Sequence, residues 1–123
     1  MKFRQQKESG EKKPTRYFSK KQEDGVAKNI QGKTTSNSGA TPYDKGDVKT
    51  DKILVECKTK TSPSKSITIQ KEWLDKLKSE SIFMKKPFWS LFFNFGPNEP
   101  NYVIISEELY LSIVDKLNSG EIE

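Results

Sequence analysis

Residues 45–58 read KGDVKTDKILVECK, and this stretch decides the fold that we expect for the chain. Apolar and β-branched residues alternate with polar ones on both sides of Asp51 and Lys52, which is typical of a β-hairpin. We expect one strand from Gly46 to Thr50 and a return strand from Ile53 to about Lys60, joined by a two-residue turn.

A two-residue turn determines which residues face each other across the hairpin. Val48 then pairs with Val55, and Asp47 falls directly opposite Glu56. The Cβ atoms of such cross-strand neighbours lie about 5 Å apart. The register therefore predicts two carboxylates side by side on one face of the hairpin.

Side chains point alternately to the two faces of a strand. Glu56 and Lys58 therefore share a face with Leu54, and Lys58 joins the two acids. Cys57 lies on the opposite, apolar face with Val55, where we expect a small buried side chain rather than a reactive thiol.

Two opposed carboxylates repel each other unless a positive charge lies between them. A divalent cation with oxygen ligands supplies that charge, and Mg²⁺, with Mn²⁺ as a substitute, is the natural candidate. The alternative interpretation is a solvated hairpin with scattered charges, because short acid-acid-lysine patterns recur by chance.

A predicted helix that carries Glu23 is followed by Ser38-Gly39-Ala40, by Lys45-Gly46-Asp47-Val48 and by Val55-Glu56-Cys57-Lys58. Together these segments resemble the PD-(D/E)XK nuclease superfamily, and within it the small Holliday junction resolvases of archaea and phages. The resemblance spans about Ser19 to Phe95, with Gly46 where the name-giving proline would stand. It implies a restriction-endonuclease-like core and metal-dependent hydrolysis of phosphodiester bonds in DNA.

In this chemistry, Asp47, Glu56 and the backbone carbonyl of Cys57 would hold one Mg²⁺, which polarises the phosphoryl oxygen and lowers the pKa of a bound water. By the resemblance, Glu23 adds a metal or water contact. Asp24, the next residue, competes for this role. The alternative for Glu23 is a solvated acid on the helix surface. We expect Lys58, beside two acids, to stay protonated and to act electrostatically rather than as a general base.

The chain has 123 residues, enough for one domain with a modest core. It has no histidine and a single cysteine, which excludes zinc clusters, Cys-His nucleophiles and disulfide frameworks. No apolar run reaches about 18 residues, and no signal peptide opens the chain. We therefore expect a cytoplasmic protein without a membrane partner, from a bacterial, archaeal or phage-infected cell.

The net charge of +5 is unevenly distributed. The first 21 residues hold eight of the 22 Lys and Arg but only two of the 17 Asp and Glu. Because these basic residues follow no apolar period, we expect residues 1–18 to form a flexible arm and residues 19–123 to form a single nuclease domain. Arg16, Lys12 and Lys13 of the arm would contact the phosphate backbone, and a solubilising tail is the alternative.

Capping signals and apolar periods predict the first two helices. Ser19 and Gln22 form a capping box for a helix from about Lys20 to Asn29. The polar residues 33–44 are expected to form a mobile segment or an edge strand. A second helix is expected from about Gln70 to Lys85, with its tryptophan in the core.

The last third of the chain predicts two strands and a helix. Residues 88–95 form an aromatic strand that is apolar on both faces, as in a central strand or one covered by a partner subunit. Residues 102–105 return from it, and Ser106 caps a helix that Gly120 ends. Its inward stripe is expected to be Leu109, Tyr110, Ile113, Val114 and Leu117. The fold class is therefore α/β (α+β), a central mixed sheet flanked by helices in the order α-β-β-β-α-β-β-α.

Further candidate DNA contacts lie outside the arm: Ser38, Lys45, Lys60, Gln70 and Lys71. Gln70 and Lys71 open the second helix, and a helix N-terminus can bind phosphate. Ser38 resembles a serine near the active site of archaeal junction resolvases. An ordinary surface position is the alternative for these residues, and the sequence shows no dedicated module for reading bases.

Three functions remain open from the sequence. The first is a homodimeric Holliday junction resolvase, in which two symmetry-related sites cut opposing strands of branched DNA and the aromatic strand or the terminal helix supplies the interface. The second is a related nuclease acting on flaps, ends or duplex sites. The third is a non-enzymatic basic DNA-binding protein.

Overall fold

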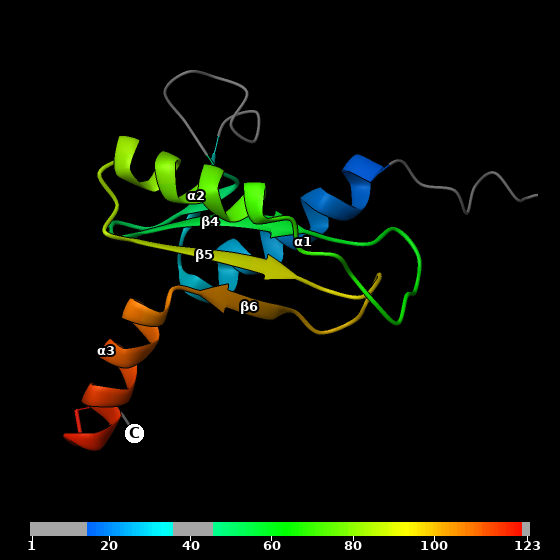
Figure 1. The fold of residues 1–123 in the computed structure, drawn as a ribbon. Coiled ribbons are helices and arrows are strands. Elements are labelled where there is room, and N and C mark those ends of the chain that lie inside the picture. Colours follow the sequence, from blue (N-terminus) through cyan, green and yellow to red (C-terminus); the bar gives the residue numbers. More distant parts are fainter. Residues whose placement is uncertain (1–14, 36–45, 122–123) are drawn as a thin grey trace, which may run out of the picture.

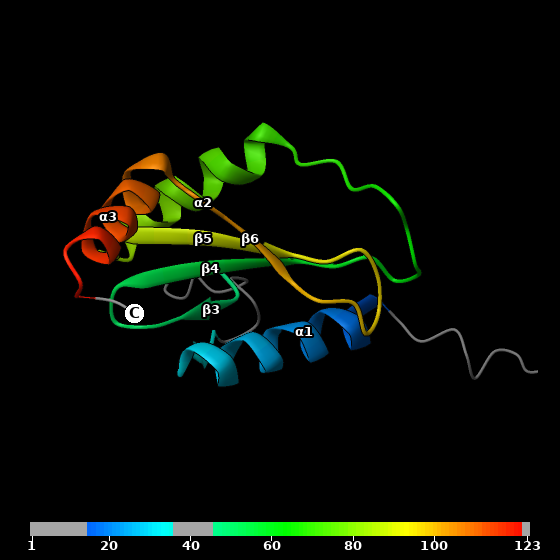
Figure 2. The same ribbon diagram turned by 90° about the horizontal axis from the view of Figure 1, so that it is seen from below.

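A computed structural model describes residues 15–35 and 46–121 of the chain. Helices α1 (Thr15–Ile30) and α2 (Lys71–Phe83) cover the opposite faces of a five-stranded sheet (Figure 1 and Figure 2). Helix α3 (Glu107–Asn118) extends away from the sheet beyond its last strand (Figure 1). The elements follow the order predicted from the sequence.

The sheet has the spatial order β2-β3-β4-β5-β6. Its strands are β2 (Lys33–Thr34), β3 (Val48–Lys49), β4 (Ile53–Lys58), β5 (Phe88–Phe93) and β6 (Tyr102–Ile105). Strands β4 and β5 are parallel, joined by a crossover through α2, and the other neighbouring pairs are antiparallel. The expected mixed sheet flanked by helices is confirmed.

The hairpin register predicted from the two-residue turn is also confirmed, since Val48 pairs with Val55. At the turn, the Thr50 amide donates to the Ile53 carbonyl at 2.9 Å, and the Thr50 hydroxyl accepts from the Ile53 amide at 3.1 Å. Both strands are shorter than predicted. Strand β3 covers Val48–Lys49 instead of Gly46 to Thr50, and β4 ends at Lys58 instead of about Lys60.

Side-chain alternation along β4 divides the core into two layers. Val55 and Cys57 belong to one buried cluster with Val26 of α1, whereas Leu54 belongs to another with Leu77 of α2. Cys57 is therefore the small buried side chain that the sequence predicted. Burial raises the pKa of its thiol, which stays protonated.

Helix α1 begins at Thr15, earlier than the capping box at Ser19 predicted. Ser19 lies inside the helix, where its hydroxyl donates to the Arg16 carbonyl at 3.2 Å. Pro14 precedes the helix in sequence, and proline is favoured at a helix start. Arg16 also lies 3.3 Å from Glu23, two turns along the same helix, and this ion pair links the added turn to the rest of α1.

The later elements follow the predicted bounds closely. Helix α2 ends before Pro87, and the Ser106 hydroxyl accepts from the Leu109 amide at 3.0 Å as the N-cap of α3. Strand β5 lies inside the sheet between β4 and β6, and its two apolar faces pack into both core clusters, Phe92 into the cluster with α1 and Leu91 into the cluster with α2. None of the described helices is long and apolar enough to span a bilayer.

The inward apolar stripe predicted for α3 is wrong. No residue of α3 is buried, and Tyr110 and Leu117 are 57% and 47% exposed. The physical reason is the path of the chain, because α3 leaves the edge of the sheet after β6 instead of folding back over a face (Figure 1).

Candidate active site at the end of strand β4

Asp47 and Glu56 lie near the end of β4, beside the point where β3 begins. Asp47 is only 6% exposed, and its Oδ2 accepts a hydrogen bond from the Cys57 amide at 2.8 Å. The Asp47 amide donates to the Val55 carbonyl at 2.8 Å, so Asp47 does not continue the regular ladder. The predicted direct pairing of Asp47 with Glu56 is therefore wrong, although the two carboxylates remain electrostatic neighbours.

Gly46 turns the backbone immediately before Asp47. Its φ of +72° lies in the region that glycine adopts without steric cost. A Cβ atom at this position would lie 2.8 Å from Leu54 Cδ1 and 3.2 Å from the Val55 carbonyl oxygen. Proline cannot adopt a positive φ, so this backbone requires glycine where the name-giving motif has proline.

Burial hinders ionisation of both acids, and the charge of Glu56 further hinders ionisation of Asp47. Burial, and next the charge of Glu56, raises the pKa of Asp47 to about 7, and Glu23 adds a smaller repulsion. Burial also raises the pKa of Glu56, against the opposing positive charges of Lys58 and Lys76. A cation placed between the two carboxylates would relieve both effects.

The backbone of β4 directs a third oxygen to the same edge. The carbonyls of Ile53 and Val55 accept hydrogen bonds from the hairpin side, and the Cys57 amide donates to Asp47 on that side. The N–H and C=O groups of one strand residue point to the same edge, and this direction alternates along the strand. The Cys57 carbonyl therefore faces the edge on which Asp47 lies, as the metal-ligand hypothesis requires.

Glu23 approaches the two acids from helix α1. It is 4% exposed, and its negative charge contributes to the raised pKa of both acids. Arg16 Nη1 lies 3.3 Å from each Glu23 carboxylate oxygen, so Arg16 belongs to the helix and to this site rather than to a flexible arm. The competing acid, Asp24, is exposed and lies 3.3 Å from Lys20. Glu23 is therefore the better candidate.

Lys58 extends from the same face of β4 as Glu56. Its Nζ lies 3.7 Å from Glu56 Oε2 and 4.4 Å from the ring centroid of Trp73. An ammonium group over a tryptophan face is stabilised by the ring quadrupole. Trp73 thus holds Lys58 beside Glu56. The sequence had assigned Trp73 to the core, and its place in the apolar stripe of α2 gave no signal of the contact with Lys58.

A pocket of about 220 Å³ lies beside Lys58. Helix α2 contributes three charged residues to its lining, Glu72, Lys76 and Glu80, and Lys76 Nζ lies 3.8 Å from Glu80 Oε2. Sequence reasoning missed these residues. Their spacing of four is visible in the sequence and indicates a common helix face, but it does not indicate which strand that face meets.

Amide side chains hold the end of β4 in place. Gln22 Nε2 donates to the Lys58 carbonyl at 2.9 Å and to Asn101 Oδ1 at 3.1 Å. The Thr59 hydroxyl donates to Asn94 Oδ1 at 2.7 Å, and Asn94 Nδ2 donates to Asn101 Oδ1 at 3.2 Å. These bonds join α1, β4 and the segment between β5 and β6, so the candidate site has a rigid support. The sequence had indicated Gln22 as a capping residue and as a member of the stripe that contains Val26, but not as a support for β4.

The other predicted contacts are not gathered at this site. Gln70 is the N-cap of α2, Lys71 forms an exposed ion pair with Asp75 at 2.9 Å, and Lys60 lies in the loop after β4. Four further candidates lie outside the described residues: Lys12, Lys13, Ser38 and Lys45. The roles of all these residues in DNA binding stay predictions.

Within residues 15–35 and 46–121, no three acidic, cysteine or histidine side chains form a ready-made metal cluster. The donor set at the end of β4 consists instead of two carboxylates, Asp47 and Glu56, and the Cys57 carbonyl. Mg²⁺ prefers such hard oxygen ligands, keeps several waters and commonly binds one or two protein carboxylates together with substrate phosphates. The residues present therefore fit Mg²⁺, whose binding stays a prediction.

Comparisons of the chain with protein-family models, with curated proteins and with solved structures found no match. The relationship to PD-(D/E)XK nucleases therefore stays a prediction that depends on the residues of this chain.

Proposed function

We propose that the chain is a Mg²⁺-dependent, structure-specific DNA endonuclease, and in the most specific form a homodimeric Holliday junction resolvase. The observation that carries the proposal is the grouping of Asp47, Glu56 and Lys58 at one end of β4, with the pKa of both acids raised. Two carboxylates and one cationic side chain are the groups that metal-assisted phosphodiester hydrolysis uses.

In this proposal, bound Mg²⁺ would polarise the scissile phosphate and lower the pKa of a water. The protein contributes preorganisation. The Cys57 amide orients the Asp47 carboxylate at 2.8 Å, and Trp73 and Glu56 hold the Lys58 ammonium beside the acids. A fixed positive charge stabilises the additional negative charge of the transition state without reorganisation of solvent.

Basic residues in the first turns of α1, and in the sequence before it, support binding to DNA. Arg16 lies in the first turns of α1, at the end of the molecule where β4 also ends (Figure 1). Residues 1–14, which precede this helix in sequence, include five basic and two acidic residues. Contacts between such side chains and phosphates supply affinity that is independent of base sequence, as recognition of DNA shape requires.

A nuclease acting on flaps, ends or duplex sites is the alternative, and it would use the same residues. A non-enzymatic DNA-binding protein fits less well, because Asp47 and Glu56 would place two acids near the phosphates with no compensating function. The shape of the preferred DNA therefore decides between the first two proposals.

The test is cleavage of a synthetic four-way junction beside duplex, flap and single-strand controls, in Mg²⁺, Mn²⁺ and EDTA. We expect metal-dependent nicks placed symmetrically on opposing strands of the junction. Cleavage of flaps or ends alone would replace the resolvase proposal with the alternative. A folded protein that cuts none of these DNAs in either metal would overturn the nuclease proposal.

A further inference from the structure

A row of three paired residues crosses the sheet at the end of β4 where the acids lie. Lys58 is paired with Phe93 of β5, and Phe93 is paired with Tyr102 of β6. Paired residues of neighbouring strands point to the same face of a sheet. Phe93 packs against the buried cluster that includes Leu77 of α2, and Lys58 meets Trp73 of the same helix. The row therefore lies on the face that carries α2.

The rings of Phe93, Phe95 and Tyr102 form one cluster, the aromatic platform. The ring centroid of Tyr102 lies 5.8 Å from that of Phe93, with 29° between the ring planes. It lies 5.7 Å from that of Phe95, with 71° between the planes. These are the distances and angles of stacked and edge-to-face aromatic pairs. Tyr102 is therefore held by a ring on each of two sides.

Tyr102 remains 50% exposed although two rings hold it. Helix α2 packs on β4 and β5, and Tyr102 belongs to the next strand. Val103, which is also exposed, points to the opposite face of β6. Within residues 15–35 and 46–121, Tyr102 is thus the one strongly exposed large hydrophobic residue on this face of β6. The platform offers a single open ring rather than a wide apolar surface.

Hydrogen bonds fix the backbone around the platform. The Ser64 amide donates to the Phe95 carbonyl at 2.8 Å. Asn94 Nδ2 donates to Asn101 Oδ1 at 3.2 Å, so the residues just before Phe95 and just before Tyr102 are joined. A tyrosine that is already ordered loses little conformational entropy when a ligand packs on it. The platform is therefore preorganised for a flat ligand.

We propose that the aromatic platform binds one unpaired nucleobase, which stacks on Tyr102 beside the phosphate at Lys58. This inference rests on the proposed function, because it takes Lys58 as the group that meets the cleaved phosphate. Two strand spacings separate Lys58 from Tyr102, a distance of about 10 Å. A base is joined to its phosphate through one sugar, so a base that leaves the stack next to the cleaved phosphate comes within reach of Tyr102.

An unpaired base fits the platform better than the other occupants do. A base inside a duplex has both faces covered by its neighbours, whereas an unpaired base offers a free π-face. A protein partner would need a contiguous apolar patch. The turn before Tyr102 is instead polar and exposed, with Asn98, Glu99 and Asn101. The platform would therefore select DNA with an unpaired nucleotide, as at a branch point or a flap.

The experiment measures the dissociation constant of the full chain for a duplex with a one-nucleotide flap, by fluorescence anisotropy in EDTA. The flap carries either a base or an abasic sugar, flaps of both polarities are compared, and a plain duplex is the reference. We expect the base to tighten binding by the wild type at least about fivefold, a change of about 1 kcal/mol. Because the metal is absent, cleavage does not enter this measurement.

Two variants of Tyr102 test the ring. Tyr102→Leu should abolish the difference between the base and the abasic sugar, whereas Tyr102→Phe keeps the ring and should retain that difference. The plain duplex should bind to the wild type and to both variants equally. This reference separates the loss of stacking from a loss of fold, which would weaken binding to every DNA.

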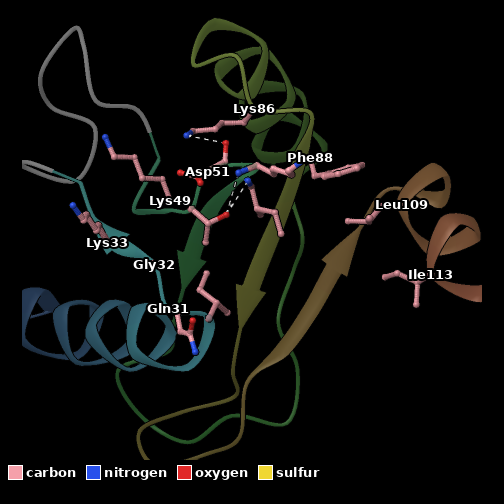
Figure 3. A pocket seen from close by; sticks show the side chains of 13 residues that line it. Gln31, Gly32, Lys33, Lys49, Asp51, Lys86, Phe88, Leu109 and Ile113 are labelled. Carbon is pink, nitrogen blue, oxygen red and sulfur yellow. Dashed lines mark hydrogen bonds between the residues drawn. The ribbon is translucent and has the colours of Figure 1, made fainter. Parts of the chain in front are cut away.

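Tyr110 provides the matched control, because it is a tyrosine of similar exposure, 57%, near the other end of β4. It belongs to the apolar arc of α3, which comprises Leu109, Tyr110, Ile113, Val114 and Leu117. Leu109 and Ile113 line an apolar groove of about 840 Å³, across an open space from Phe88 (Figure 3). Tyr110→Leu should keep the wild-type preference for the base, because Tyr110 lies outside the row that contains Lys58.

Equal binding of the base and the abasic flap by the wild type would overturn the proposal, and so would a Tyr102→Leu variant that keeps the difference. A Tyr102→Leu variant that loses affinity for every DNA alike would assign the ring a structural role and overturn it too. A lower mass in solution with an unchanged base preference would assign the ring to a second copy, with the same consequence. Loss of cleavage with the base preference intact would overturn the nuclease proposal alone.

Discussion

The two ends of strand β4 carry opposite kinds of unfavourable environment. At the C-terminal end, Asp47 is buried and Glu56 is mostly covered. At the N-terminal end, an apolar groove and the apolar arc of α3 remain in contact with water. Burial of charge and exposure of apolar surface both reduce the stability of a small domain. The proposed metal ion would relieve the buried charge at the C-terminal end only.

Each environment has an origin in the path of the backbone. Gly46 turns the chain just before β3, so the edge of β4 at Cys57 meets the Asp47 carboxylate instead of a regular strand. At the other end, α3 leaves the sheet after β6 and extends away from it (Figure 1). Changes of charge or of metal binding at the acid end can therefore be measured independently of the groove.

The largest effect is expected from Asp47→Asn and Glu56→Gln, which remove the proposed ligands at the acid end. Loss of metal-ion catalysis removes several kcal/mol of transition-state stabilisation, so single-turnover cleavage should fall at least about 1,000-fold. DNA binding should persist or strengthen, because a negative charge near phosphate is lost. Asp51→Asn, in the turn at the other end of the hairpin, is the matched control and should cleave normally. Wild-type cleavage by either ligand variant would remove the metal assignment.

Lys58→Ala tests whether the cation at the acid end acts on the transition state. Removal of one such electrostatic donor typically costs about 100-fold or more in rate. We expect a loss of that size in single-turnover cleavage, with little change in the dissociation constant for DNA. Lys60→Ala, in the loop just after β4, is the control and should affect affinity at most. A Lys58→Ala defect confined to affinity would place Lys58 among the backbone contacts.

The burial of charge at the acid end should be visible in the pH dependence of stability without DNA or metal. The pKa of Asp47 is about 7 in the fold against an ordinary value of 3.8. Between these values the folded state binds more protons than the unfolded state, so the free energy of unfolding falls as pH rises.

Asp47→Asn removes the pH-dependent contribution of Asp47 to the free energy of unfolding. The asparagine keeps an oxygen that can accept a hydrogen bond from the Cys57 amide. Urea unfolding measures the free energy of unfolding at each pH. As pH rises from 5 to 8, we expect this free energy to increase by about 2 kcal/mol in the variant relative to wild type. The slope that remains would reflect Glu56, whose pKa is also raised. Parallel curves for the wild type and Asp47→Asn would contradict the charge burial described for this end.

The smallest effect is expected at Trp73, which contacts Lys58 but would not touch DNA phosphate. Loss of a cation–π contact of about 1 kcal/mol should release the ammonium, so Trp73→Leu should slow single-turnover cleavage roughly tenfold at most. Trp73→Phe keeps an aromatic face and should retain most of the rate. Equal losses in both variants, accompanied by equal losses of stability, would indicate a packing role only.

Local signals in the sequence were sufficient for most of the fold. The two-residue turn determined the pairing of Val48 with Val55, and Ser106 marked the start of α3, because turn length and capping depend on neighbouring residues only. The helix start predicted from the capping box at Ser19 is wrong, because a local signal of this kind does not exclude a longer helix. The same residue types are compatible with a helix interior, and the ion pair between Arg16 and Glu23 supports the longer helix.

The sequence by itself determined that Glu56 and Lys58 share a face, because alternation along a strand is a local property of the backbone. Only the tertiary structure decided that Glu23 rather than Asp24 approaches the acids and that Trp73 lies against Lys58. Both contacts depend on how α1 and α2 rotate and pack on the sheet. An apolar period identifies the side of a helix that faces the core, but it does not specify which strand residue each side chain meets. In the same way, the apolar arc of α3 was readable in the sequence, whereas its position outside the core followed from the direction in which the chain leaves β6.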